Sequence, residues 1–257
     1  MGGFEGKVAI LFGAARGIGA ATARAFVREG GRALVVDILD EVGEALAAEL
    51  GTDRCRYRHG DVGRAADIEA AYTAVVDAFG GVDVVLNNVG IARYGTVDQL
   101  SLEDWETSIR VNLTAEFVSA HHAIPLLRAR GGSVIVNTSS ILGHASQKTT
   151  ASYAAAKAGV QGLTRTIAID HAREGIRCVS ISPGTIDTPL TQSVARGIAG
   201  DDPAGLIASW ADAHPMGRLG TVEEVAETIL FLASPRAGFI TGADILIDGG
   251  IRSELYA

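Results

Sequence analysis

Tyr153 and Lys157 lie four residues apart in an alanine-rich run, Tyr153-Ala154-Ala155-Ala156-Lys157. Alanine favours a helix, and side chains four residues apart share a helix face, so a phenol and an ammonium group are expected side by side. A free tyrosine has a pKa of roughly 10, and a nearby cation lowers that pKa by favouring the phenolate. The pair predicts a general acid or base for interconverting an alcohol and a carbonyl. By itself, however, this spacing is common on solvated surface helices.

Two further polar side chains strengthen the prediction of a catalytic site. Ser140 directly follows the predicted strand 133–139, thirteen residues before Tyr153, where its hydroxyl could hydrogen-bond a substrate oxygen. Asn112 falls inside a predicted helix, in Val111-Asn112-Leu113. Because asparagine is a mediocre helix residue, Asn112 could hold a water molecule or loosen the helical hydrogen bonds.

A glycine-rich turn follows the first predicted strand and reads Gly13-Ala14-Ala15-Arg16-Gly17-Ile18-Gly19. Its spacing, G-x-x-x-G-x-G, differs from the G-x-G-x-x-G pattern usually quoted for dinucleotide binding. Glycines allow a tight turn and the close approach of a pyrophosphate, and the following helix offers free N–H groups and a partial positive charge. The turn predicts a dinucleotide site; a strand-to-helix turn without a ligand is the alternative.

Asp37 ends the second predicted strand, where a carboxylate can accept hydrogen bonds from both ribose hydroxyls of an adenosine. Its charge would repel a 2′-phosphate, so we expect NAD rather than NADP. Arg16 in the glycine turn would favour the 2′-phosphate, and Asp37 could instead cap the next helix. Asp61-Val62 follows the third strand, where the adenine ring would lie. Asp61 either accepts from the adenine amino group or caps the helix beginning near Arg64.

Short β-branched runs alternate with alanine-rich helical stretches along the chain. The predicted strands are residues 7–12, 32–37, 54–59, 82–87, 133–139, 177–182 and 244–247. This alternation indicates a doubly wound, Rossmann-like α/β fold: seven parallel strands with helices on both faces, in a single domain over residues 1–257. Such sheets bind ligands at the carboxyl ends of their strands. The chemically interesting residues directly after strands are Gly13, Asp37, Asp61, Asn88, Ser140 and Pro183.

The segment 188–220 departs from this alternation. It is long, rich in alanine and glycine, and follows a strand end, which favours a lid over an active site. A surface helix pair without a special role is the alternative. His144 and Gln147, between Ser140 and Tyr153, are candidate residues of a substrate pocket.

The joint pattern resembles the short-chain dehydrogenase/reductase family, in particular its simple one-domain branch of about this length. The resemblance covers nearly the whole chain and rests on the glycine turn, Asn87-Asn88-Val89-Gly90, Asn112, Ser140, Tyr153-x-x-x-Lys157 and Pro183-Gly184. It implies an oxidoreductase that interconverts a secondary alcohol and a ketone or other carbonyl, with hydride passing to or from a nicotinamide cofactor.

The resemblance also implies a role for each matching residue. Tyr153 would be the catalytic acid or base, Lys157 would lower its pKa and bind the nicotinamide ribose, and Ser140 would orient the substrate oxygen. Asn112 would hold a water molecule in a proton relay that reaches solvent through Lys157. The remaining cofactor contacts would come from Asn88 and Gly90 on the adenosine-ribose side, and from Pro183, Gly184, the Ile186 backbone and the Thr188 side chain near the nicotinamide.

The chain departs from the family pattern at two positions beside the cofactor site. Phe12 stands where the family usually has a threonine that ties the glycine turn to the Asn-Asn-x-Gly strand, and Val89 replaces the usual alanine. Neither side chain is expected to touch the reacting atoms. We therefore expect altered packing and retained function.

Composition excludes several classes of partner. The chain has 257 residues and a formal net charge of -8, which argues against nucleic acid and anionic membranes because both need clustered cations. No apolar run is long enough to cross a bilayer, and residues 1–6 match neither a signal peptide nor a myristoylation site, so we expect a cytoplasmic protein. Cys55 and Cys178 lack metal-ligand spacing, and no cluster of His, Cys or carboxylates predicts a metal.

Two other functions are weighed against the leading one. Reduction of a 3-oxoacyl chain on acyl carrier protein usually draws on NADPH and needs a basic docking patch, so Asp37 and the acidic charge argue against it. A non-catalytic dinucleotide sensor would be expected to lack Tyr153 or Lys157. By analogy with the family we expect a homo-oligomer, specifically a tetramer. The substrate is a small alcohol or carbonyl compound; sugars, polyols, steroids and small cyclic alcohols all fit.

Overall fold

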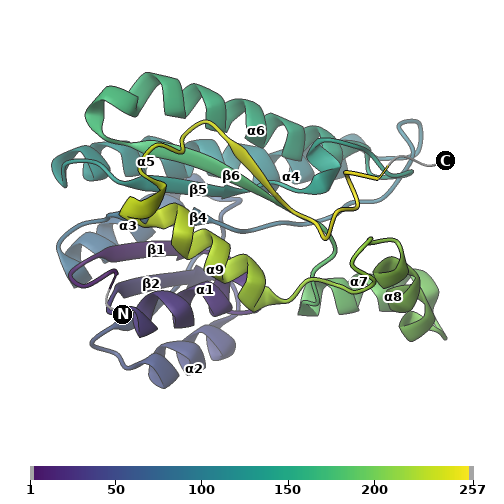
Figure 1. Cartoon of the computed structure of the whole chain (residues 1–257), viewed down its shortest axis with the longest axis horizontal. Coiled ribbons are helices and arrows are strands. Elements are labelled where there is room, and N and C mark those ends of the chain that lie inside the picture. The colour runs from purple at the N-terminus through teal and green to yellow at the C-terminus, as the bar shows by residue number, and fades with distance from the viewer. Residues whose placement is uncertain (1–2, 255–257) are drawn as a thin grey trace.

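The fold is a seven-stranded parallel sheet covered by helices on both faces (Figure 1), as predicted. The computed structural model describes residues 3–254, so the two ends of the predicted single domain, residues 1–257, lie outside the described residues. The strands follow the order β3-β2-β1-β4-β5-β6-β7, and each neighbouring pair is parallel. Their bounds are β1 Val8–Phe12, β2 Arg32–Asp37, β3 Cys55–His59, β4 Val84–Asn87, β5 Val134–Thr138, β6 Arg177–Pro183 and β7 Asp244–Ile247.

The helices divide between the two faces of the sheet. On one face lie α1 (Gly17–Arg28), α2 (Asp40–Leu50) and α9 (Val222–Ala233). On the other lie α3 (Ala65–Phe79), α5 (Ala115–Ala129) and α6 (Ala151–His171), with α4 (Leu102–Ile109) packed on α6. Short 3₁₀ segments occur at Ile141–Gly143, Ala172–Glu174 and Pro235–Ala237, and a π-helical segment at Arg110–Thr114 joins α4 to α5.

Continuous apolar strands explain why the sheet is buried on both sides. Every residue of β1, β4 and β5 is buried, and alternate side chains of each strand enter two separate core clusters, one per face. Burying apolar surface is worth about 25 cal/mol per Å², so these strands and the apolar faces of their helices hold the scaffold rigid. The carboxyl ends of the strands form one edge, where the connecting loops meet.

The segment predicted as a lid consists of two helices, α7 (Pro189–Ala199) and α8 (Pro203–Asp212). They pack on each other beyond the end of β6 and stand apart from the helices that cover the sheet (Figure 1). Thr188 caps α7 by accepting a hydrogen bond from the Thr191 backbone N–H, and Pro189 occupies its first turn. The cap and the proline start the helix sharply at the point where the chain leaves the sheet.

Candidate active site

A cavity of about 530 Å³ lies at the carboxyl edge of the sheet. It extends from the glycine turn after β1, past the ends of β2 to β6, to helix α7. It brings together most of the predicted site residues: Gly13, Arg16, Gly17, Ile18, Asp37, Asp61, Val62, Asn88, Gly90, Ser140, Gln147, Tyr153, Lys157, Pro183, Gly184, Ile186 and Thr188. Gly19, Asn112 and His144 do not line it.

The glycine turn has no room for side chains. Gly13 has φ of 70°, and a Cβ there would lie 2.8 Å from a methyl group of Val89. A Cβ on Gly19 would lie 2.5 Å from both the Gly13 carbonyl oxygen and the Ala14 Cα. Helix α1 begins at Gly17 with no side-chain cap on its N-terminal N–H groups. Gly17 and Ile18, at the start of α1, line the cavity, so an uncapped helix N-terminus beside a tight glycine turn suits a bound pyrophosphate.

Asp37 binds the glycine turn and does not cap the next helix. Its Oδ2 accepts a hydrogen bond from the Ala15 N–H at 3.0 Å, and its Oδ1 accepts from the Ile38 and Leu39 N–H groups. Helix α2 begins at Asp40 without a side-chain cap. The carboxylate is therefore held at the cavity wall, beside the exposed Arg16 side chain.

Asp61 and Val62 lie in the cavity wall after β3. Asp61 Oδ1 accepts a hydrogen bond from the Gly63 N–H, which closes a local turn, and Arg64 starts α3 without a side-chain cap. Asp61 thus does not cap α3, which was the alternative to a contact with adenine. Val62 is buried.

Asn88 ties the glycine turn to β4. Its Nδ2 donates to the Gly13 carbonyl oxygen at 2.9 Å, and its backbone N–H donates to the Phe12 carbonyl oxygen. Phe12 itself is buried against Tyr72 in the core. The connection that a threonine at position 12 would provide is therefore made by the Asn88 side chain.

Ser140 and Tyr153 are neighbours across the end of β5 and the start of α6. The Ser140 hydroxyl also accepts a hydrogen bond from the Leu142 N–H, which starts the 3₁₀ segment. Burial raises the pKa of the Tyr153 phenol; the Ser140 hydroxyl works to lower it, and the Glu116 carboxyl raises it further. The lowering of this pKa expected from Lys157 is not found, because burial is the largest influence and Lys157 is not among the groups that shift the phenol.

Lys157 is 1% exposed, and its Nζ donates a hydrogen bond to the Thr138 carbonyl oxygen at 2.6 Å. The Nζ atom lies 5.9 Å from the centre of the Tyr153 ring, so the two side chains do lie side by side on α6. Burial lowers the pKa of the Lys157 ammonium, while the Glu116 carboxyl opposes that shift. Glu116, which the sequence reasoning missed, is buried 3.7 Å from Nζ.

Asn112 lies in the π-helical segment, where the regular helical hydrogen bonds are displaced. Its side chain makes a reciprocal pair with the Ile91 backbone: Oδ1 accepts from the N–H, and Nδ2 donates to the carbonyl oxygen. Nδ2 also donates to the Ser108 carbonyl oxygen. The loosened helix was anticipated, and π-bulges are frequent at functional sites. Asn112 holds the loop of Gly90 against the cavity.

The loop after β6 completes the far wall. A Cβ on Gly184 would lie 2.9 Å from His214 Nε2 and 3.0 Å from the Asp248 Cα, so this position also requires glycine. His214 Nε2 accepts a hydrogen bond from the Thr185 N–H, which links the residues after α8 to this loop. Ile186 is buried, and Leu190 of α7 and Trp210 of α8 line the cavity.

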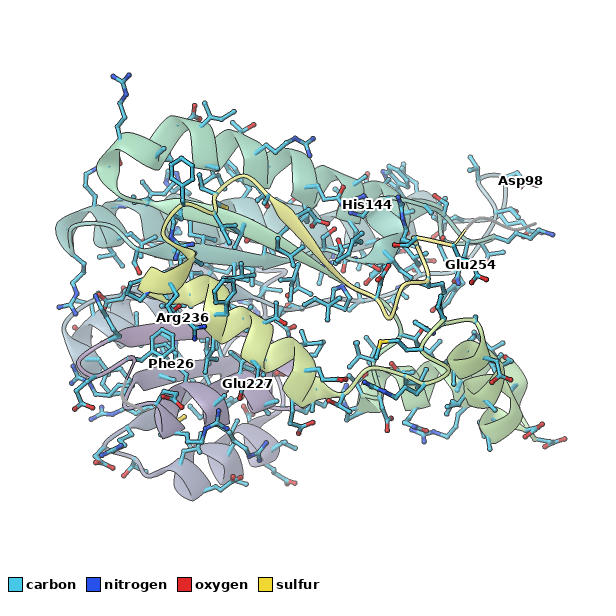
Figure 2. All side chains as sticks on the ribbon, viewed as in Figure 1. Phe26, Asp98, His144, Glu227, Arg236 and Glu254 are labelled. Atoms are coloured by element: carbon cyan, nitrogen blue, oxygen red, sulfur yellow. The ribbon has the colours of Figure 1, made fainter. Side chains whose placement is uncertain are left out.

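Of the two candidate pocket residues, the structure places only Gln147 in the cavity wall. His144, labelled in Figure 2, instead pairs with Asp244 at the start of β7, with 2.6 Å between Nε2 and Oδ2. Within residues 3–254, no group of three His, Cys, Asp or Glu side chains has the geometry to hold a metal ion. None of the helices in that range is both long and apolar enough to cross a membrane.

Comparison with known proteins shows the family. The family model described as "Enoyl-(Acyl carrier protein) reductase" matches residues 13–252. The chain is 40% identical over 252 residues to the trans-4-hydroxycyclohexanecarboxylate dehydrogenase of Sinomonas cyclohexanicum, covering 95% of this chain and 92% of that one. The chain is 39% identical over 245 residues to the 3-alpha-(or 20-beta)-hydroxysteroid dehydrogenase of Mycobacterium tuberculosis H37Rv, covering 95% and 89%.

The solved structures agree. The crystal structure of levodione reductase superposes with a TM-score of 0.94 at 30% identity, covering 98% of this chain and all (100%) of that one. The protein belongs to the short-chain dehydrogenase/reductase family. It is an oxidoreductase that interconverts secondary alcohols and carbonyl compounds with a nicotinamide dinucleotide.

Proposed function

We propose that the protein is an NAD-dependent dehydrogenase of uncharged secondary alcohols, with Tyr153 as the general acid or base. The observation that supports this best is the cavity, which joins the glycine turn and Asp37 at one end to Ser140, Tyr153 and Lys157 at the other. The residues fit a dinucleotide, because glycines stand where a Cβ would fill the turn and the N-terminus of α1 is uncapped. When bound, the nicotinamide would accept or donate the hydride.

Each side chain then has a defined task. Ser140 holds the substrate oxygen, and Tyr153 takes the hydroxyl proton during oxidation or returns it during reduction. Lys157 supplies positive charge beside the phenol and binds the nicotinamide ribose. Asn112 shapes the Gly90 loop and holds the first water of a relay to Lys157. The cofactor is held by the glycine turn, by the loops carrying Asp61, Val62, Asn88 and Gly90, and by Pro183, Gly184, Ile186 and Thr188.

The raised pKa of Tyr153 has a consequence for the direction of catalysis. A phenol that keeps its proton is ready to protonate a developing alkoxide, whereas oxidation needs the phenolate. Oxidation should therefore become faster as the pH rises, and carbonyl reduction should dominate at lower pH.

The preference for NAD rests on Asp37. Its carboxylate is fixed by the Ala15, Ile38 and Leu39 N–H groups at the cavity wall, so it cannot swing away from a 2′-phosphate. Two like charges in a confined site repel. Kinetics with both cofactors test this: a strong NADPH preference would overturn the proposal and favour reduction of an acyl-carrier substrate.

The preference for an uncharged substrate rests on the lid side of the cavity. The charged residues in its lining, Arg16, Asp37, Asp61 and Lys157, belong to the cofactor loops or the catalytic group. The substrate side is lined by Ile91, Ala92, Tyr94, Leu142, Gln147, Leu190, Val194, Ile198 and Trp210. Burying a charge without a partner is costly. Cyclohexanol should therefore exceed trans-4-hydroxycyclohexanecarboxylate in kcat/KM by about tenfold or more; equal or better turnover of the carboxylate would refute the assignment.

Tyr153→Phe tests the central role. The variant should lose alcohol oxidation while it still binds NADH, because only the proton-transferring oxygen is removed. Tyr72→Phe is the matched control: Tyr72 is a buried core residue bonded to Ser119, and its variant should stay active. Substantial turnover by Tyr153→Phe would overturn the assignment.

We further propose a cytoplasmic homotetramer with the segment 188–220 as its substrate lid. Large apolar side chains are exposed on two surfaces, Trp105 and Phe117 on α4 and α5, and Ile169, Phe239 and Leu246 near β7. Such surfaces favour association between subunits. Both cysteines are free and buried, which suits a reducing compartment. Light scattering that gives a monomer mass would refute the tetramer.

A further inference from the structure

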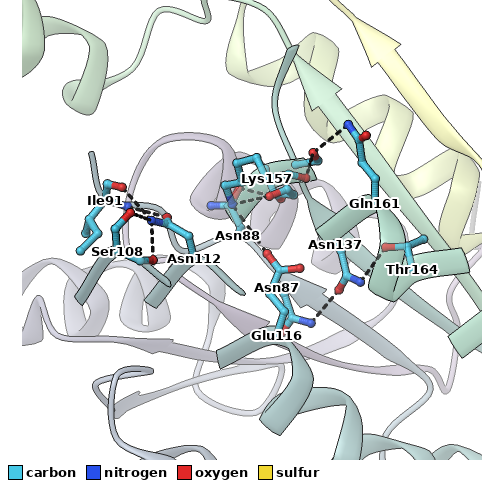
Figure 3. A network of polar contacts seen from close by, with 12 residues as sticks. Asn87, Asn88, Ile91, Ser108, Asn112, Glu116, Asn137, Lys157, Gln161 and Thr164 are labelled. Atoms are coloured by element: carbon cyan, nitrogen blue, oxygen red, sulfur yellow. Dashed lines mark hydrogen bonds and ion pairs between the residues drawn. The ribbon is translucent and has the colours of Figure 1, made fainter. Parts of the chain in front are cut away.

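A buried carboxyl group, Glu116, lies beside Lys157 (Figure 3). It is in the first turn of α5, four residues after Asn112, and is 4% exposed. Its Oε1 lies 3.7 Å from Lys157 Nζ. Among the described residues, neither of its oxygens has a hydrogen-bond partner. A buried polar group without such a partner is destabilising. We therefore looked for a function that would explain this carboxyl.

The polar groups around Glu116 are mostly committed elsewhere. Asn87 donates to Asn137, and Asn137 donates to Thr164, so this amide chain runs past the carboxyl without binding it (Figure 3). The position would be compatible with a neutral side chain. A carboxyl there instead introduces one ionisable group beside one buried ammonium group.

Glu116 and Lys157 each shift the pKa of the other in the direction opposite to the shift caused by burial. Burial raises the pKa of the Glu116 carboxyl to about 8, and the Lys157 ammonium opposes this shift. Burial lowers the pKa of Lys157, and Glu116 opposes that shift in turn. Each charge is therefore favoured by the other, and removing either would push its partner towards the neutral form.

We propose that Glu116 is a positioning residue for the reaction: its carboxylate keeps Lys157 charged and in place beside Tyr153, and so sets the pH range of turnover. This inference rests on the roles proposed above for Tyr153 and Lys157. Glu116 lies beneath the lysine, outside the cavity lining, so it acts through Lys157 and does not touch the substrate.

Three titratable groups face the Glu116 carboxyl from neighbouring elements: Lys157 and Tyr153 on α6 and Cys178 on β6. Burial raises the pKa of Cys178 to about 12, so this thiol stays neutral. Tyr94 interacts with Tyr153 and is itself raised in pKa by burial. Lys157 is therefore the cation that balances Glu116 within this group.

The sign of the effect follows from the charge. Above about pH 8, where the Glu116 carboxyl is ionised, replacing it by glutamine removes a negative charge. Tyr153 and Lys157 then both bind their protons less tightly. The pKa of Tyr153 and the pKa of Lys157 should both fall. Because oxidation needs the phenolate and the ammonium together, both limbs of its pH profile should move to lower pH. A charge at about 4 Å shifts a pKa by roughly 1 to 3 units, so we expect a displacement of about one unit or more.

The experiment measures kcat/KM for alcohol oxidation with NAD against pH. E116Q should move both limbs down, whereas E116D, which keeps the charge, should move them less than half as far. E106Q is the control, because Glu106 is exposed on α4 and its variant changes the net charge equally. If E116Q fails to fold, Glu116→Met removes the same charge without burying an amide.

Unchanged limbs in E116Q would overturn the proposal, and so would a uniform loss of rate without displacement, which is what a purely structural role predicts. NADH binding by fluorescence reports that each variant retains its cofactor site. Tyr153→Phe separates the two levels: if it abolishes turnover while E116Q leaves the limbs in place, the proposed function stands and only the role of Glu116 fails.

Discussion

Asp83 and Glu116 are both buried carboxyl groups, but they lie at opposite ends of the central strands and are bound very differently. Asp83 precedes β4 at the amino edge and is 1% exposed. Its Oδ1 accepts from Lys7 Nζ, and its Oδ2 accepts from the Val8 N–H and from Arg130, at 2.9 to 3.0 Å. Burial works to raise its pKa, but these hydrogen bonds outweigh it and hold the pKa below its usual value.

Glu116, near the carboxyl edge, has no such hydrogen bonds in the described part of the chain, and its pKa rises to about 8. The contrast between Asp83 and Glu116 indicates that the amino edge of the sheet serves stability and the carboxyl edge serves the reaction. A fully bonded carboxylate is fixed in its ionised form and holds structure together. A carboxyl whose proton is finely balanced can respond to its neighbours, which is typical of functional sites.

The strongest test of the carboxyl edge is Gly19→Ala. The added Cβ would lie 2.5 Å from backbone atoms of the glycine turn, so the turn itself must move. A displacement of about 1 Å in a binding site can reduce activity by about 100-fold, and NADH affinity should fall accordingly. Titration of NADH fluorescence measures it. Gly162→Ala on α6, where the nearest atom is a mobile arginine end at 3.8 Å, should bind NADH normally.

The matching test of the amino edge is Asp83→Asn. It leaves Lys7 and Arg130 without their shared carboxylate; because both cations are partly exposed, the expected cost is that of lost hydrogen bonds to a charged group, about 1.5 to 3 kcal/mol. Urea unfolding at pH 7 should show this loss, with kcat preserved at low temperature. The exposed Asp170 provides the control variant, Asp170→Asn. If Asp83→Asn kept its stability but lost turnover, Asp83 would serve the reaction and not the stability of the fold.

The pH dependence of the same variant has a definite sign. Since the folded-state pKa of Asp83 is lowered, its contribution is present above the unfolded-state pKa of about 4 and disappears as the pH falls through the folded-state value. The stability difference between wild type and Asp83→Asn should therefore shrink in acid.

The parts of this architecture that depend on local sequence could be predicted. Strand ends, the glycine turn and the shared face of Tyr153 and Lys157 follow from short-range periodicity and sterics, and the sheet confirms the strands to within two residues. Burial could not be predicted in this way. It reverses the expected shift in the pKa of Tyr153 and sends His144 to Asp244 instead of the cavity.

Glu116 shows most clearly why the rest was missed. A glutamate early in a helix is ordinarily a solvated residue that favours the helix N-terminus. Its spacing of four residues from Asn112 was an available signal, because both side chains then face α6. That signal becomes meaningful only when the depth of the helix in the fold is known.

Stability measured against pH distinguishes the two carboxyls directly. A folded-state pKa near 8 for Glu116 means that its protonated form stabilises the fold below about pH 4, and that this contribution is lost as the pH rises to about 8, by up to about 1.4 kcal/mol per pH unit. E116Q lacks this loss, so its free energy of unfolding should rise relative to that of the wild type as the pH increases from about 5 to about 8. Thermal denaturation at several pH values measures the trend. If E116Q instead lost stability relative to the wild type as the pH rose, the Glu116 carboxylate would be a stabilising anion like Asp83.

Asp37 combines features of the two carboxyls, and its variant should have the smallest effect. Its oxygens accept three hydrogen bonds, as those of Asp83 do, but all three come from backbone N–H groups, and its carboxylate lines the cavity. Asp37→Ala should raise the NADP-to-NAD ratio of kcat/KM by about tenfold, equivalent to about 1.4 kcal/mol, because the repulsion of a 2′-phosphate is removed while Arg16 remains. Asp53→Ala, at an exposed site outside the cavity lining, should leave the ratio unchanged. If Asp37→Ala instead destabilised the fold and left the ratio unaltered, its carboxylate would be structural, and the carboxyl edge would owe its cofactor preference to another residue.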